Sequence, residues 1–282
     1  MHQRLPISRW HEGRTTDALD AVAMEAPLEL RVSFLRDGRR IERPLVTTLR
    51  TPGDDRSLAL GWLFAERIVD RAEQVEAITE EALLPDADQP VASRLLVRLA
   101  DSVTLDTDQL GRASISNASC GLCGRITLGD LGRTEPIAAP VGTWPAPSHL
   151  AAWSEQVAAH QHTFDATGGI HAVARFSFAG ELRDLAEDVG RHNALDKVVG
   201  RALAKGALPL SGEALWFSGR AGFEMVHKAA RAGASLVVSV GAPTTLAVQV
   251  AQTAGITLVG FLRNGRHNVY AHADRFAPHT GA

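Results

Sequence analysis

Cysteine is scarce in this sequence, and its only two thiols stand three positions apart. Cys120 and Cys123 lie in the heptapeptide ASCGLCG, residues 118–124, with a glycine after each. Without further cysteines there is no multi-bridge disulfide framework and no second Cys-x-x-Cys to complete a four-cysteine zinc site. Three interpretations remain: a structural disulfide, a metal clip completed by histidines, or a reactive thiol on a mobile loop.

The chain also lacks a strong excess of charge and a membrane-like segment. The net charge is −3 over 282 residues, which is not the electrostatic signature of a nucleic-acid-binding protein. The N-terminus has no apolar core typical of a signal peptide. Residues 235–262 carry no charge, but Pro243 and several glycines interrupt them, as expected for buried strands and a helix. We therefore expect a soluble cytoplasmic protein with no membrane or nucleic-acid partner, in which thiols stay reduced and a structural disulfide is disfavoured.

The pattern along the chain predicts two regions after a polar tail at residues 1–20. Residues 21–135 form an N-terminal, β-rich α+β region that carries the Cys-x-x-Cys loop. Its signals are a hairpin around Asp37–Gly38, a helix over 57–69 and a strand over 94–100. Four prolines between residues 136 and 147 mark a change of organisation. Residues 148–282 form a C-terminal α/β domain.

The C-terminal region alternates strand and helix patterns. A hairpin turns at Ala179–Gly180, and a helix begins near Gly190. Strands over 213–217, 235–240 and 256–262 then alternate with helices over 223–233 and 246–255. Short strands joined by helices imply a parallel α/β sheet with right-handed crossovers.

Three loops follow the strands of this sheet, at the edge where α/β proteins bind ligands. They span residues 218–222, 241–245 and 263–268, and they carry Arg220, Arg263 and Arg266. The first two also open helices, whose N-terminal amides attract anions, and arginine matches phosphate geometrically. Any single loop would be read as a simple turn, but the three together favour a phosphate-bearing ligand.

Residues 187–197, EDVGRHNALDK, are dense in functional groups. His192 and Asp196 are one helical turn apart and can share a face. The segment is compatible with an exposed helix start held by ion pairs. His171 lies in a predicted strand, and we expect a structural role for it.

The sequence supports some roles for the cysteine pair better than others. A zinc deaminase would show His-x-Glu and Pro-Cys-x-x-Cys, but no His-x-Glu occurs and Ser119 precedes Cys120. A thioredoxin-like pair would lie in a βαβ unit, whereas this one lies outside that region. A glycine-flanked loop suits a carrier thiolate, which can take a donor's outer sulfur, hold it as a persulfide and swing to an acceptor.

With these motifs the chain resembles the formate dehydrogenase accessory sulfurtransferases, the FdhD family, over nearly its whole length after the tail. The most specific match is EDVGRHNALDKVVGRAL. The other matching segments are APLELRV, LRTPGDDRSLALGWLFAERIV, SCGLCG, GGIHAVA, SGRAGFEMVHKAA and GAPTTLAVQVAQTAGITLVGFLRNGRHNVYAH. One departure is Ile170, where the family often has threonine.

The resemblance implies a function. Such proteins accept sulfur from a cysteine desulfurase and pass it to the molybdenum cofactor carrying two molybdopterin guanine dinucleotides, which formate dehydrogenase then receives. It also implies that Cys120 carries the persulfide and that Cys123 is its partner. The implied cofactor-binding residues are Phe261, Leu262, Arg263, Asn264, Gly265 and Arg266, to which our reading of the loops adds Arg220. The implied structure is a homodimer with a cytidine-deaminase-like C-terminal domain and no tightly bound metal of its own.

Two other functions stay open at this point. The chain could be a chaperone that binds the molybdenum cofactor without turning over sulfur. It could also be a thiol redox or zinc protein.

Overall fold

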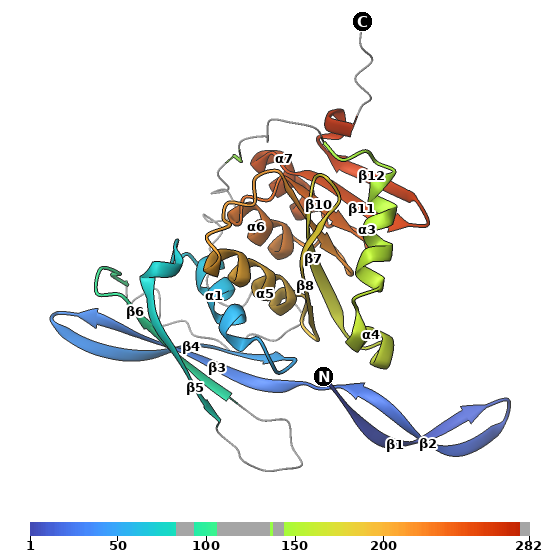
Figure 1. Cartoon of the computed structure of the whole chain (residues 1–282), viewed down its shortest axis with the longest axis horizontal. Coiled ribbons are helices and arrows are strands. Elements are labelled where there is room, and N and C mark those ends of the chain that lie inside the picture. Colours follow the sequence, from blue (N-terminus) through green and yellow to red (C-terminus); the bar gives the residue numbers. More distant parts are fainter. Residues whose placement is uncertain (83–92, 106–135, 138–143, 277–282) are drawn as a thin grey trace, which may run out of the picture.

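The computed structural model describes residues 1–82, 93–105, 136–137 and 144–276. Three sheets organise this part of the chain (Figure 1). They are a two-stranded hairpin at the N-terminus, a four-stranded sheet and a six-stranded sheet, and helices connect and cover the two larger sheets.

The four-stranded sheet has the order β4-β3-β6-β5. Its strands are β3 (Ala26–Arg36), β4 (Arg39–Arg50), β5 (Val75–Ala82) and β6 (Ser93–Leu99). The predicted hairpin turn is confirmed: Asp37 and Gly38 both have positive φ, as a two-residue hairpin turn requires. The predicted helix is shorter than expected, because α1 (Asp55–Ala65) ends before Arg67, which adopts positive φ.

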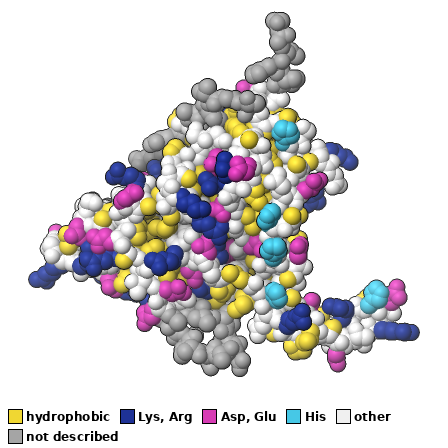
Figure 2. All heavy atoms as spheres, in the orientation of Figure 1, with side chains coloured by type: hydrophobic (Ala, Val, Ile, Leu, Met, Phe, Trp, Pro, Cys, Tyr) yellow, Lys and Arg dark blue, Asp and Glu magenta, His cyan; other side chains and the backbone are white. Residues whose placement is uncertain are grey.

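The predicted loose tail is wrong. Residues 2–23 form an antiparallel hairpin of β1 (His2–His11) and β2 (Arg14–Ala23), which extends away from the body beside α4 (Figure 1). Its sequence reads as polar because the hairpin buries almost nothing: Trp10 is 71% exposed and Leu19 is 63% exposed. Figure 2 shows charged, histidine and apolar side chains exposed along it.

The six-stranded sheet has the order β12-β11-β10-β9-β7-β8. Its strands are β7 (His171–Ser177), β8 (Leu182–Asp188), β9 (Glu213–Phe217), β10 (Leu236–Ser239), β11 (Thr257–Arg263) and β12 (Arg266–Ala271). The predicted parallel core is confirmed for β9, β10 and β11, and the strands outside them pair antiparallel. The fold class is therefore mixed α/β, as expected.

Helices cover both faces of this sheet. On one face lie α5 (Arg191–Ala204), α6 (Phe223–Arg231) and α7 (Thr245–Ala254). On the other lies α3 (His149–Ala158), which is followed by α4 (His162–Thr167). Alternate strand residues serve the two faces: Leu215 packs with α5–α7, whereas its neighbour Trp216 packs with α3. The described residues also form two short helices, η1 (Ala72–Gln74) and η3 (Ala273–Phe276).

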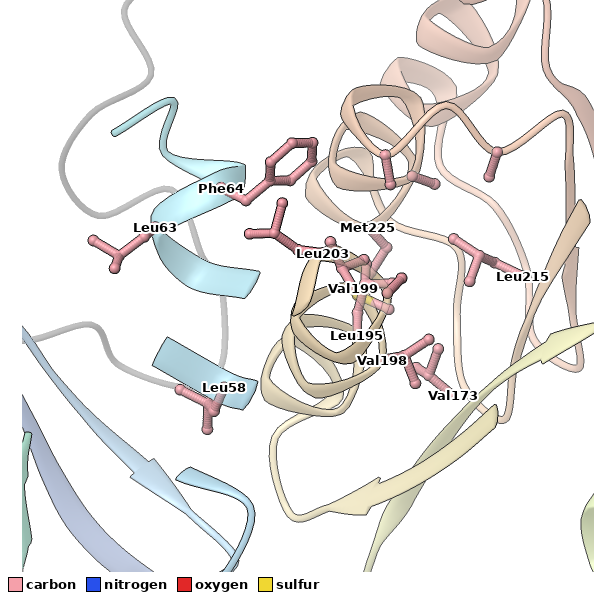
Figure 3. Packing of buried hydrophobic residues seen from close by; sticks show 14 of the residues in the cluster. Leu58, Leu63, Phe64, Val173, Leu195, Val198, Val199, Leu203, Leu215 and Met225 are labelled. Carbon is pink, nitrogen blue, oxygen red and sulfur yellow. The ribbon is translucent and has the colours of Figure 1, made fainter. Parts of the chain in front are cut away.

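The N-terminal and C-terminal regions share one hydrophobic core, through the contact of α1 with α5. A Cβ atom on Gly200 would lie 1.8 Å from the backbone oxygen of Ser57, and one on Gly61 would lie 1.9 Å from that of Asp196. The two glycines therefore let the helix backbones touch. Figure 3 shows Phe64 of α1 beside Leu203 of α5. No helix within the described ranges combines the length and apolar composition needed to cross a bilayer.

Candidate functional site

Backbone hydrogen bonds join the three predicted loops at the carboxyl edge of the sheet. Gly241 N donates to Gly219 O over 3.0 Å, and Thr244 N donates to Ala221 O over 3.2 Å. Phe261 N donates to Gly241 O over 3.0 Å. Segments separated by about twenty residues in the sequence therefore form one continuous rim.

The third predicted loop is not a loop over its whole length. Residues 263–268 belong to the β11–β12 hairpin, with its turn at Asn264 and Gly265, which both have positive φ, and β12 begins at Arg266. A register slip between Gly260 and Arg263 turns Phe261 outward, where it is 47% exposed. Of the six residues expected to bind cofactor, five are exposed, and Leu262 is buried in the core that packs against α3.

A cavity of about 290 Å³ lies at this rim, between the first residues of three helices. Its lining consists of Arg191, His192, Arg220, Gly222, Phe223, Glu224, Thr244, Thr245 and Leu246. These residues belong to the N-termini of α5, α6 and α7, apart from Arg220 in the preceding loop.

The cavity combines several groups that attract anions. The N-cap residues of the three helices, Gly190, Gly222 and Thr244, make no side-chain capping hydrogen bond. The first amide groups of each helix are therefore available to an anion, and the helix dipoles favour negative charge there. Arg191 and Arg220 add two guanidinium groups to the same lining. Arg191, like Glu224, was missed from the sequence because nothing in the local pattern indicates that α5 opens beside α6.

Glu224 and His192 lie side by side in the lining of the cavity. His192 Nε2 lies 3.2 Å from Glu224 Oε2, and the two side chains are only 13% and 15% exposed. Burial lowers the pKa of His192 to about 3, an effect that Lys228 and Arg191 reinforce. Burial also raises the pKa of Glu224 to about 7, against the opposing charge of Lys228. Both groups are therefore driven towards their neutral forms.

Most of the EDVGRHNALDK segment is buried, so its interpretation as an exposed helix start is wrong. Lys197 Nζ lies 2.7 Å from Asp188 Oδ2 and donates to Thr51 O over 3.0 Å. Asp188 also accepts from the amides of Thr51 and Gly190, and Asn193 Nδ2 donates to both Asp188 and Leu49 O. These bonds join the start of α5 to the end of β4, so this part of the segment connects the two regions.

His192 and Asp196 face α6 rather than each other. Lys228 Nζ donates to both carboxylate oxygens of Asp196, over 2.8 and 2.6 Å, and both side chains are almost fully buried. Asp196 therefore anchors α5 to α6 behind the cavity, and only His192 reaches the cavity lining.

His171 lies at the same rim rather than deep in the core. It is partly buried, and its ring lies about 3.4 Å from where a Cβ on Gly219 would stand. Burial lowers its pKa, and the charge of Arg191 lowers it further. This separation is ordinary van der Waals contact, so the imidazole lies directly beside the 218–222 loop.

A model of the FdhD/NarQ family matches residues 24–277 of this chain. The chain belongs to the FdhD/NarQ family. The match begins just after the β1–β2 hairpin and includes both larger sheets and the cavity.

Several curated relatives carry the name Sulfur carrier protein FdhD. That of Streptomyces avermitilis is 41% identical, and the alignment covers 99% of this chain and 97% of the relative. That of Anaeromyxobacter dehalogenans strain 2CP-1 is 44% identical, with 91% and 88% covered. That of Sulfolobus acidocaldarius is 36% identical, with 97% and 98% covered.

A solved structure shares the fold. It is the crystal structure of a protein from Desulfotalea psychrophila that is provisionally described as a formate dehydrogenase accessory protein. The TM-score is 0.73 at 22% identity, and the match covers 98% of this chain and 99% of the other. This likeness supports the arrangement of sheets and helices across the FdhD/NarQ chain.

The predicted site residues divide into two groups in this FdhD/NarQ protein. Cys120 and Cys123 lie outside the described residues, so their roles stay predictions. Arg220 lines the cavity. The hairpin residues 261–266 reach the same rim through the bond from Phe261 to Gly241.

Proposed function

We propose that this chain is a sulfur carrier that holds sulfur as a persulfide on Cys120. The observation that carries the proposal is its similarity, over nearly its whole length, to proteins named Sulfur carrier protein FdhD. The cysteine-poor sequence supports it, because the only two thiols stand three positions apart with a glycine after each.

The proposed loading step is a thiol–persulfide exchange with a cysteine desulfurase. The Cys120 thiolate attacks the outer sulfur of the donor's persulfide, and the donor thiolate leaves with the electron pair of the broken S–S bond. A Cys120 persulfide results. Attack of the Cys123 thiolate on the inner sulfur then releases hydrosulfide and forms a Cys120–Cys123 disulfide, which a cellular dithiol reduces.

The proposed acceptor is the molybdenum cofactor that carries two guanine dinucleotides and is destined for formate dehydrogenase. The three helix N-termini with Arg191 and Arg220 support this proposal, because they suit the diphosphates of such a ligand. The exposed ring of Phe261 offers a stacking surface at the same rim.

Intact mass measurement tests the loading step. After incubation with a desulfurase and cysteine, the wild-type chain should gain the mass of one sulfur, about 32 Da, which a reductant removes. Cys120→Ala should lose this gain and fail to activate formate dehydrogenase. Cys123→Ala is the matched control: it should still load but deliver poorly. Full loading and activation by Cys120→Ala would overturn the assignment of the persulfide.

We also propose that the carrier works as a homodimer in which the thiol loop and the cofactor edge share one concave face, either within one subunit or across the two. If the site is shared across subunits, the inactive variants Cys120→Ala and Arg263→Ala should regain activity when they are mixed and allowed to exchange subunits, because one of the two sites then keeps both groups. No recovery would show that each subunit is self-contained. A monomer at micromolar concentration by light scattering would exclude the dimer.

The second candidate function is a cofactor-binding chaperone without sulfur turnover. The feature that favours it is the cavity itself, because its two arginines and three helix N-termini suit the binding of a phosphate-bearing cofactor without any sulfur chemistry. The two functions differ in one outcome: a double variant, Cys120→Ala with Cys123→Ala, would still activate formate dehydrogenase if the protein were only a chaperone.

A further inference from the structure

Glu224 is an unexpected residue in a cavity otherwise suited to anions. Its Oε2 atom is buried and has no hydrogen-bond partner in the described part of the chain, although His192 Nε2 lies 3.2 Å away. A buried polar atom without a partner is costly, and such atoms require an explanation. A carboxylate would also repel phosphate, so the arginines alone do not account for it.

The chemistry of a carboxylate limits what can satisfy it here. Above its pKa of about 7, the Glu224 carboxyl is ionised and only accepts hydrogen bonds, so a ligand that binds it there must present donors, best as an adjacent pair. The Watson–Crick edge of guanine has such a pair in N1–H and the exocyclic amine. Adenine pairs a donor with an acceptor at the corresponding edge, and that acceptor would face the carboxylate oxygen. Phe223 and Leu246 line the same cavity and offer apolar surface to the faces of a base.

We propose that Glu224 recognises the guanine base of the ligand, accepting hydrogen bonds from N1–H and the exocyclic amine. The base occupies the inner end of the cavity, against His192 and Glu224. The phosphates lie towards Arg220 and the N-terminus of α7, at the rim. This inference rests on the proposed binding of a guanine nucleotide cofactor and assigns its specificity to one side chain.

Nucleotide titrations with the full chain test the assignment. The probes are GDP, IDP, which lacks the exocyclic amine, and inorganic pyrophosphate, which lacks the base; all are titrated at about pH 8, where the Glu224 carboxyl is mostly ionised. We expect the wild type to bind GDP about tenfold or more tightly than IDP, because the missing donor leaves the carboxylate partly unpaired. Glu224→Gln keeps the size of the side chain but replaces one acceptor by a donor, so its GDP and IDP affinities should be nearly equal.

Two comparisons distinguish an effect of Glu224 on the base from an effect on the phosphates and from a nonspecific effect of removing a carboxylate. If Glu224 acts on the base, the affinities of the wild type and Glu224→Gln for pyrophosphate should differ by less than about threefold. Glu181→Gln is the matched control, because Glu181 lies on the exposed β7–β8 turn, away from the cavity. It should keep the wild-type preference for GDP. Thermal melts show that the variants are folded.

Each outcome decides the question. An unchanged GDP-to-IDP ratio in folded Glu224→Gln would overturn the assignment while leaving nucleotide binding intact. A change in pyrophosphate affinity as large as the change in GDP affinity would place Glu224 at the phosphates instead. No binding of GDP to the wild type would overturn the proposed ligand itself, and the assignment with it.

Discussion

The charged residues behind the cavity and those at its rim come from the same sequence segments but behave in opposite ways. Behind the cavity, Asp188 pairs with Lys197 and Asp196 pairs with Lys228. At the rim, Arg220 lines the cavity and is exposed to solvent. One turn of α5 separates the two behaviours: Asp196 is buried and bonded, whereas His192 reaches the cavity. A high density of charged residues in a motif therefore indicates that the motif matters, but it does not show whether those residues stabilise the fold or bind a ligand.

The largest effect is expected behind the cavity. Lys228→Met removes the partner of Asp196, which is almost fully buried, and should lower the free energy of unfolding by about 3–5 kcal/mol. Adding Asp196→Leu should restore most of the loss, because two apolar side chains then face each other. Denaturant titration measures both. Equal stability of Lys228→Met and the wild type would show that the ion pair does not hold α5 to α6.

Glu224 lies between the ion pairs behind the cavity and the residues at its rim, and its titration makes stability depend on pH. Its pKa is about 7 in the folded chain against an ordinary value of 4.5, mainly through burial. The folded state keeps a proton that the unfolded state loses, so this group's contribution to stability falls as pH rises from about 4.5 to about 7. The pKa of His192, about 3 against 6.5, acts in the opposite direction below pH 6.5.

The variant Glu224→Gln isolates the carboxyl from His192. Relative to the wild type, it should gain up to about 3 kcal/mol of unfolding free energy between pH 4.5 and 7, then stay level. The other charged groups that act on Glu224 are Arg191 and Asp196 on α5, Lys228 on α6 and Glu66 after α1; all remain in the variant. Denaturant midpoints across this pH range measure the difference. A constant difference between the two proteins would mean that Glu224 titrates normally.

A purely geometric change should cost somewhat less. Gly200→Ala places a Cβ 1.8 Å from the Ser57 oxygen, so α1 and α5 must separate. Overpacking of this kind should cost about 1–3 kcal/mol of unfolding free energy, whereas Lys205→Ala at the exposed end of α5 should change it little. Thermal or denaturant unfolding distinguishes them. A neutral Gly200→Ala would mean that the helices have room to move apart.

The smallest effect on stability is expected at the β11–β12 hairpin, where a substitution should weaken ligand binding instead. Arg263 is exposed, so Arg263→Ala should leave stability within about 0.5 kcal/mol of the wild type. Loss of a charged hydrogen bond should weaken GDP binding roughly tenfold or more in calorimetry. Equal affinities would remove Arg263 from the site and leave the cavity residues to bind the ligand.

Local patterns were reliable where a segment's own periodicity decides its structure. The hairpin at Asp37–Gly38, the helix that starts after Gly190 and the β9–β11 strands with their helices are all present. The β1–β2 hairpin was missed because its strands bury almost no side chains, so no alternation of apolar residues marks them. The β12 strand was missed because Gly265 and Asn268 resemble a loop, although only Asn264 and Gly265 form the turn.

The sequence by itself determined the mixed α/β class, the meeting of three arginine-bearing or helix-opening segments at one sheet edge, and the membership in a family through its motifs. These follow from short-range periodicity and from residue identity, which a linear reading contains. Only the tertiary structure decided that Asp188, Asn193 and Lys197 hold the end of β4, and that Glu224 stands in the cavity. The physical reason is that a charge acquires its partner and its pKa from groups that are distant in sequence: Lys228 follows Asp196 by 32 residues, and Thr51 precedes Lys197 by 146.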